Sequence, residues 1–180
     1  MTHVALINPI DTTPDRAGVL AQVQAAFGAT PNMFKAVANS PAALNSMWSA
    51  FGALGKGTLG SKLGEQIAVA VAEANRCEYC LAAHTALGKG AGVSAADLTA
   101  AQSGQSSDPK TAAALAFALK LVSKRGQISQ DDVAAVRKAG FSDEHIVEIL
   151  AHVALNIFTN YTNVAFDVPV DFDKVAFAAR

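Results

Sequence analysis

Apolar residues recur along most of this chain at spacings of three and four positions, which is typical of amphipathic helices. Clean alternation of apolar and polar positions, the pattern of half-buried strands, is scarce. After Ser40, for example, one helical face collects Leu44, Trp48, Phe51 and Leu54. The pattern therefore predicts an all-α protein.

Capping and helix-breaking residues divide this pattern into separate helices. The first of them begins at a proline and is followed directly by a glycine, and serine supplies several N-caps. The clearest linker is "SGQSSDP", which is small, polar and ends in proline. The predicted helices cover Pro14–Phe27, a short stretch between Pro31 and Ser40, Pro41 to about Leu54, Ser61–Asn75, Cys77–Leu87, Ser94–Ala101, Pro109–Lys124, Gln130–Lys138 and Asp143–Phe166.

The length of 180 residues suits one domain, here taken as 1–180. The part of the domain that bears the cysteine motif is expected at about 40–101, and the C-terminal helices at about 109–166. Two segments of the chain are similar to each other, because "AGVSAADL" resembles "AGFSDEHI" further on. Each has a helix-ending glycine, an apolar residue and a capping serine. This is either a faint duplication of helical pairs or two uses of a common turn.

Composition narrows the classes of protein that the chain can belong to. It is 51% hydrophobic and 16% charged, which allows a sizeable core. A net charge of −1 without a long basic run gives no support for binding nucleic acid or an anionic membrane. The N-terminus lacks the features of a signal peptide, and no apolar run could span a bilayer. We therefore expect a cytoplasmic protein, in which paired cysteines indicate redox or metal chemistry.

The stretch "CEYCLAAHT" holds both cysteines of the chain and one of its four histidines. On a helix, at about 100° per residue, Cys77, Cys80 and His84 fall within about 60° of each other. A helix start and a nearby imidazole both favour thiolate, and the sulfur pair can then cycle between dithiol and disulfide. A carboxylate could accept the proton or orient the imidazole, and the candidates are Glu73 and Glu65.

Purely structural interpretations of the same residues remain open at this point. Buried cysteines can pack as small apolar side chains. A structural zinc site would need a fourth ligand beside Cys77, Cys80 and His84, and His152 is the one candidate that could approach in space. Glu65 could be an exposed helix residue. Glu73, near the end of its predicted helix, could simply cap or solvate that helix end.

A polar stripe is predicted on the last long helix, beside an apolar face. It favours a subunit contact or a hydrogen-bonded core network over catalysis. The stripe consists of His145, His152, Asn156, Thr159 and Asn163. Four bulky side chains are expected in the core or an interface, although they could also wall an approach to the thiols: Phe34, Met47, Trp48 and Phe51.

The segment "EQIAVAVAEANRCEYCLAAH" fixes a glutamate, two cysteines and a histidine at once. This spacing resembles the alkylhydroperoxidase D-like branch of the carboxymuconolactone decarboxylase family. The flanks "TPNMFKAVANSPAALNSMWSAF" and "LNIFTNYTNVAFDVPVDF" are similar to its peroxidase-related members, so the resemblance covers about Pro31 to Phe172. It implies an all-helical fold, trimers or hexamers, and reduction of hydroperoxides or electron transfer to a partner peroxiredoxin.

The resemblance also implies a role for each residue. Cys80 matches the cysteine that attacks peroxide and becomes a sulfenic acid, and Cys77 the one that then closes the disulfide. Glu65 and His84 match the proton-relay pair. One departure is Tyr79, because the best-studied members carry a histidine just before the second cysteine, and tyrosine is no base at neutral pH. The lactone decarboxylase branch generally lacks paired cysteines.

These observations predict a helical, alkylhydroperoxidase D-like, self-associating enzyme. It would reduce hydroperoxides through Cys77 and Cys80, with Glu65 and His84 as relay, at the expense of an external dithiol or protein thiol. No metal, flavin or haem cofactor is implied. The alternatives are a thiol–disulfide oxidoreductase that serves a protein partner such as a peroxiredoxin, and a non-catalytic helical assembly protein.

Overall fold

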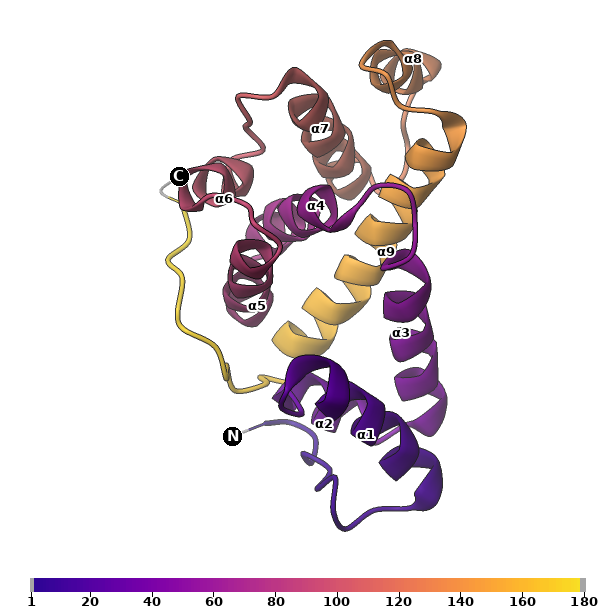
Figure 1. Ribbon diagram of the computed structural model, residues 1–180, viewed down its shortest axis with the longest axis vertical. Coiled ribbons are helices and arrows are strands. Elements are labelled where there is room, and N and C mark those ends of the chain that lie inside the picture. The colour runs from indigo at the N-terminus through magenta and orange to yellow at the C-terminus, as the bar shows by residue number, and fades with distance from the viewer. Residues whose placement is uncertain (1, 179–180) are drawn as a thin grey trace.

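The structure is a computed structural model that describes residues 2–178. Within that range the ordered elements are helices and no strand occurs, which confirms the predicted all-α class (Figure 1). The elements are α1 (Pro14–Phe27), α2 (Asn32–Val37), α3 (Pro41–Leu54), α4 (Ser61–Ala74), α5 (Glu78–Gly90), α6 (Ala95–Gln102), α7 (Pro109–Ser123), α8 (Gln130–Lys138) and α9 (Asp143–Ala165).

Local sequence explains where most of these helices begin. Proline occupies the first turn of α1, α3 and α7, where its missing N–H is not needed. Side-chain oxygens of Ser40, Ser94, Asp108, Ser129 and Ser142 accept the free backbone N–H groups at the starts of five helices. The predicted helices agree with the observed ones to within a few residues.

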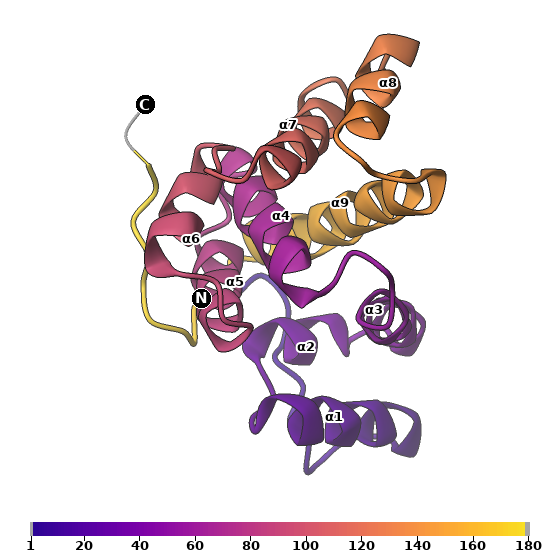
Figure 2. The same ribbon diagram turned by 45° about the horizontal axis from the view of Figure 1, so that its top comes forward.

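Helix α4 lies at the centre and packs against α5, α6, α7 and α9 (Figures 1 and 2). Its inner positions from Ile67 to Ala72 are buried in one continuous hydrophobic cluster. At one end, α1 to α3 form a layer in which α2 and α3 contact the long helix α9. The central packing thereby brings the glutamate on α4, the cysteines on α5 and the polar stripe on α9 together.

After α9 the chain runs in an extended path beside α5 and α6, and we call residues 168–178 the C-terminal strap (Figures 1 and 2). The Asp171 carboxylate accepts a hydrogen bond from the backbone N–H of Asn32 at 2.7 Å. Further along, the guanidinium of Arg76 lies 3.8 Å from the centre of the Phe177 ring. These contacts tie the strap across the segment that carries the cysteines.

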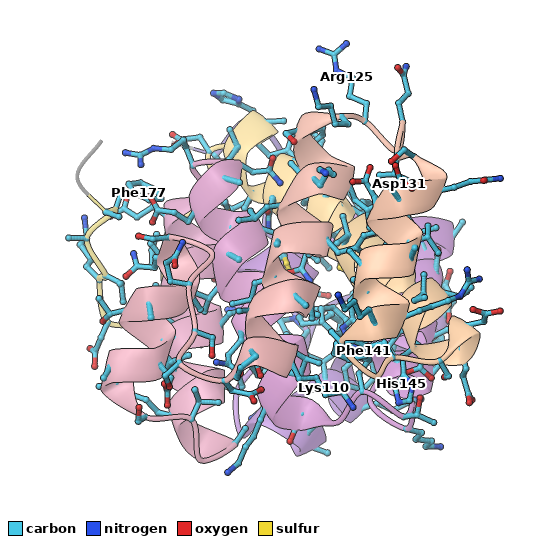
Figure 3. All side chains as sticks on the ribbon, turned by 90° about the horizontal axis from the view of Figure 1, so that it is seen from above. Lys110, Arg125, Asp131, Phe141, His145 and Phe177 are labelled. Carbon is cyan, nitrogen blue, oxygen red and sulfur yellow. The ribbon has the colours of Figure 1, made fainter. Side chains whose placement is uncertain are left out.

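The two similar segments form the same local structure. Gly92 and Gly140 have left-handed φ angles of 82° and 90°, which glycine adopts without steric cost. Ser94 and Ser142 then cap α6 and α9. Figure 3 labels the second turn, where Phe141 lies between Lys110 and the ring of His145. A common turn is thus observed, and an origin by duplication stays a prediction.

Among the described helices, none combines the length and the apolar composition needed to cross a membrane.

Candidate active site

The two cysteines lie at the start of α5, where the chain turns sharply out of α4. Arg76 has a left-handed φ of 54°, which ends the preceding helix and lets α5 begin at the next residue but one. Cys77 is therefore not inside the helix but is its N-cap, and its sulfur accepts a hydrogen bond from the N–H of Cys80 at 3.2 Å. Both thiols are free, and the Cys77 thiol donates to the Cys80 sulfur across 2.6 Å.

The environment of Cys80 favours its thiolate. Burial alone would raise the pKa of Cys80, but the hydrogen bond from Cys77, the charge of His84 and an amide of Asn163 together lower it to about 7. The Asn163 amide nitrogen lies 3.1 Å from the sulfur. The pKa of Cys77 is raised, first because it donates its hydrogen to Cys80 and second because it is buried. Cys80 is thus the thiol that ionises first.

His84 and Glu65 form the predicted pair, with 2.8 Å between imidazole Nδ1 and carboxylate Oε2. Burial by itself would lower the pKa of His84, but the charge and hydrogen bond of Glu65 outweigh it and raise that pKa. The raised pKa keeps a positive charge near Cys80 over a wider pH range. Glu65 comes from α4 and His84 from α5, so the packing of these two helices makes the pair.

A small cavity of about 40 Å³ leads to Cys80. Its lining is almost wholly apolar, and His84 is the one ionisable base in it. Phe34 and Phe51 belong both to the hydrophobic core and to the wall of this cavity, the two positions that the sequence suggests for them. The remaining lining residues are Phe27, Pro31, Met33, Tyr79, Ala83, Leu87, Thr159 and Phe172.

Tyr79 is a wall of this cavity and is not an acid–base group. Its hydroxyl accepts a hydrogen bond from the N–H of Met33 at 3.3 Å, and its ring packs edge-on against Phe172 of the strap at 5.6 Å. Burial raises the pKa of Tyr79 far above neutrality. The residue that departs from the family pattern therefore joins α5 to α2 and the strap.

Glu73, the rival candidate for the relay, is engaged elsewhere. Its carboxylate pairs with Arg76 at 2.9 Å and accepts hydrogen bonds from Gln102 and from the backbone of Ala178. Glu73 therefore holds the strap and the turn before α5, and Glu65 is the carboxylate at the imidazole.

The structure divides the polar stripe of α9 between different tasks. His145 belongs to the capping box at the start of the helix. Asn163 contacts Cys80, and Thr159 lines the same small cavity. The oxygen of Asn160, a buried neighbour that the sequence analysis did not single out, accepts from Asn75. Its position one turn before Asn163 was the only signal that could have identified it.

Among residues 2–178, no three His, Cys, Asp or Glu side chains come together as a metal-binding group. His152, the fourth ligand considered for a zinc site, instead lines a second cavity with Glu65 and His84.

Comparison with known proteins agrees with this arrangement. Residues 41–124 match the model of the Carboxymuconolactone decarboxylase family. An uncharacterized peroxidase-related protein from Silicibacter sp. TM1040 is 26% identical, with a TM-score of 0.80 over 97% of this chain and 92% of the other. The alkylhydroperoxidase AhpD core of an uncharacterized peroxidase-related protein from Ralstonia eutropha JMP134 is 25% identical, with a TM-score of 0.82 over 94% and 92%.

The fold is shared more widely. The debrominase Bmp8 is 23% identical and superposes with a TM-score of 0.81 over 95% of this chain and 93% of its own. A search among curated proteins finds no significant match. The matched segment 41–124 includes the whole Glu65–Cys77–Cys80–His84 constellation, so this part of the chain is similar to the carboxymuconolactone decarboxylase family, and the chain has the all-helical fold of the two peroxidase-related proteins.

Proposed function

We propose that the protein is a thiol-dependent peroxidase with Cys80 as nucleophile. The observation that carries the proposal is that Cys80, with its pKa lowered to about 7, lies at an apolar cavity beside the Glu65–His84 pair. A thiol with this pKa is ionised to a substantial fraction at neutral pH, and a thiolate that a small molecule can reach is the chemical requirement for attack on a peroxide.

The proposed reaction balances without a cofactor. The Cys80 thiolate attacks the terminal peroxide oxygen, the O–O bond breaks, and RO⁻ leaves and takes a proton to become ROH. Cys80 is then a sulfenic acid, which condenses with the Cys77 thiol to give a disulfide and water. An external dithiol or protein thiol reduces the disulfide and is itself oxidised. Such a cycle needs a reducing compartment, so we propose a cytoplasmic location.

Burial favours this activity over disulfide exchange with a protein partner. Cys77 and Cys80 are 1% and 2% exposed, and the strap lies beside them. Exchange requires the sulfur of a partner to reach one of these two atoms in line. The cavity instead has room for a few water-sized groups, which suits the peroxide end of a small molecule.

A panel of assays tests the proposal. Hydrogen peroxide, tert-butyl hydroperoxide and cumene hydroperoxide are each supplied with dithiothreitol, and loss of peroxide is followed. We expect turnover in the wild type and none in Cys80→Ser. Wild type that consumes no peroxide, but exchanges disulfides with an oxidised protein substrate, would favour the oxidoreductase alternative.

Debromination is the second activity to measure, because the aromatic wall beside Cys80 could stack on a flat ring. A cysteine-to-alanine variant of Bmp8 has been solved with 2,3,4-tribromopyrrole. The cavity of about 40 Å³ is small for a ring that carries three bromine atoms. We therefore expect no bromide release from that compound under conditions in which peroxide is consumed.

Self-association is a further part of the proposal. Helix α9 exposes a row of large apolar side chains on one face at helical spacing: Val147, Leu150, Phe158 and Tyr161. The family resemblance points to a homotrimer or homohexamer, and closed symmetric assemblies are the usual outcome for such contacts.

A further inference from the structure

A second cavity, of about 140 Å³, is lined by both members of the Glu65–His84 pair and by neither thiol. It is bounded by α4, α5, α9 and the end of α3, and His84 is shared between the two cavities. Its mouth is formed by the exposed residues Gly60 and Ser61. His84 and Phe51 thus line both the small apolar cavity at Cys80 and the larger cavity that contains Glu65.

The lining of the second cavity is more polar than that of the first. Glu65, His152 and Asn156 face the second, while the first is walled by aromatic and aliphatic side chains. Moving a proton through an apolar wall is costly, since no group on the way can carry the charge. The second cavity therefore offers a polar route for the proton that Cys80 exchanges with solvent.

Asn156 indicates that water occupies this cavity. Its amide nitrogen donates to the backbone oxygen of His152 at 2.9 Å. Its Oδ1 atom is buried and, among the residues that the structure describes, has no hydrogen-bond partner. A buried acceptor without a partner, at the wall of a polar cavity with room for several waters, is the usual position of an ordered water.

His152 lines this cavity together with both members of the relay pair, whose charges act on its imidazole. Its Cε1 atom would be 3.2 Å from a Cβ placed on Gly64, so a larger residue at that position of α4 would press on the imidazole. The ionisable groups that face His152 are Glu65 on α4, His84 on α5 and Glu148 on its own helix. Glu148 is occupied, because its carboxylate accepts the backbone N–H groups of Thr58 and Leu59.

We propose that the second cavity is a water-filled proton-exchange route of the thiol site, and that His152 positions its water against the Glu65–His84 pair. This inference rests on the proposed peroxidase function. A proton leaves Cys80 when the thiolate forms, and one returns when RO⁻ leaves, so the route carries protons in both directions. Both thiol protons end in ROH and water, and no net proton is lost. His152 does not touch the substrate and is a positioning residue.

The test compares His152→Leu and His152→Gln with wild type, and uses His145→Gln as a matched control on the same helix. The first readout needs no peroxide: NMR measures how fast the ring N–H of His84 exchanges with water. We expect slower exchange in His152→Leu, and exchange near that of wild type in His152→Gln and in the control, because an amide can still hold water. Gly64→Ala narrows the cavity and should slow exchange in the same way.

The second readout is peroxide turnover in light and heavy water. His152→Leu should lose about tenfold in kcat, with an increased solvent isotope effect and an unchanged KM. Unaltered exchange at His84 in both His152→Leu and Gly64→Ala, with folding intact by circular dichroism, would overturn the inference. If exchange responds as expected but wild type consumes no peroxide, the proposed function fails and the proton route stands.

Discussion

The imidazole Nδ1 of His84 on α5 lies 2.8 Å from the carboxylate Oε2 of Glu65 on α4, nineteen positions earlier in the chain. This contact joins the two central helices at the point where the apolar and the polar cavity meet. It also sets the electrostatics of the thiol, since the pKa of His84 is raised mainly by Glu65 once the opposing effect of burial is overcome.

Glu65→Gln keeps the shape of the side chain and removes its charge. We expect peroxide turnover to fall at least about tenfold, because general-base groups contribute about 10²–10⁴-fold. The control is Glu73→Gln, which loosens the ion pair with Arg76 but leaves the imidazole alone. Loss of turnover in Glu73→Gln, together with unchanged turnover in Glu65→Gln, would contradict the assignment of Glu65 to the relay.

The same variant should change how stability depends on pH. Because the folded-state pKa of His84 is raised, the ion pair stabilises the fold below the unfolded-state pKa of about 6.5 and is lost as pH rises through the raised value. Glu65→Gln should therefore lower the free energy of unfolding most near pH 5–6 and little at higher pH. Denaturant unfolding at several pH values measures this, and a difference that grows with pH would contradict it.

Cys77→Ser should separate the roles of the two thiols. Without a resolving thiol, peroxide should leave a sulfenic acid at Cys80 that a dimedone-type reagent traps, whereas Cys80→Ser should give none. In the wild type, alkylation of Cys80 should rise with pH to a midpoint near its pKa of about 7. Mass spectrometry of the labelled peptides decides, and a trapped adduct at Cys77 would reverse the assignment.

Asn163→Ala removes the amide that donates to the Cys80 sulfur at 3.1 Å. A hydrogen bond to a charged group contributes about 1.5–3 kcal/mol, so the pKa of Cys80 should rise by about 1–2 units. Thiolate absorbance in the ultraviolet follows the titration. Asn45→Ala, which removes an exposed amide bonded only to the backbone of Pro41, is the control and should leave the titration unchanged.

Tyr79→Phe tests whether the tyrosine takes part in proton transfer. It deletes the hydroxyl that accepts from Met33, which should destabilise the fold by about 1–3 kcal/mol because a buried N–H loses its partner. Turnover should stay within about threefold of wild type, far less than the effect of losing an acid–base group. A hundredfold loss in a folded variant would make Tyr79 part of the relay.

The exposed row on α9 predicts that the protein assembles. Light scattering should give a multiple of the 18.5 kDa monomer mass, and three or six copies are expected. A charge in the row, as in Leu150→Glu or Tyr161→Glu, should reduce the mass, whereas Ala116→Glu on the exposed side of α7 should not. A wild-type monomer at micromolar concentration would refute the prediction.

Much of the fold could be predicted because its signals are local. Prolines at helix starts and serine caps act within one turn, so the sequence places α3, α6 and α9 to within a residue or two. The cap of α5 was missed, since sulfur is not among the oxygen side chains that usually mark an N-cap. The left-handed φ of Arg76 separates the cysteine helix from the helix before it, and no glycine or proline marks this break in the sequence.

The site could be predicted only in part, for a related reason. Cys80 and His84 lie on α5 and Cys77 is its N-cap, so spacing alone brings the three residues together. Periodicity could not choose between Glu65 and Glu73, because that choice depends on how α4 packs against α5 and on a strap that begins near residue 168. Asn163 is 83 positions from Cys80, and the second cavity exists only once four helices have packed.

The position of Cys77 as the cap of α5 links redox state to helix stability. In the reduced protein its sulfur satisfies a free backbone N–H at the helix start, and the neighbouring thiolate lies at the positive end of the helix dipole. Closing the disulfide removes that negative charge. Interactions that favour the reduced pair raise its reduction potential, so we expect a Cys77–Cys80 couple at the first turn of α5 to be a stronger oxidant than the same two cysteines in an unfolded chain.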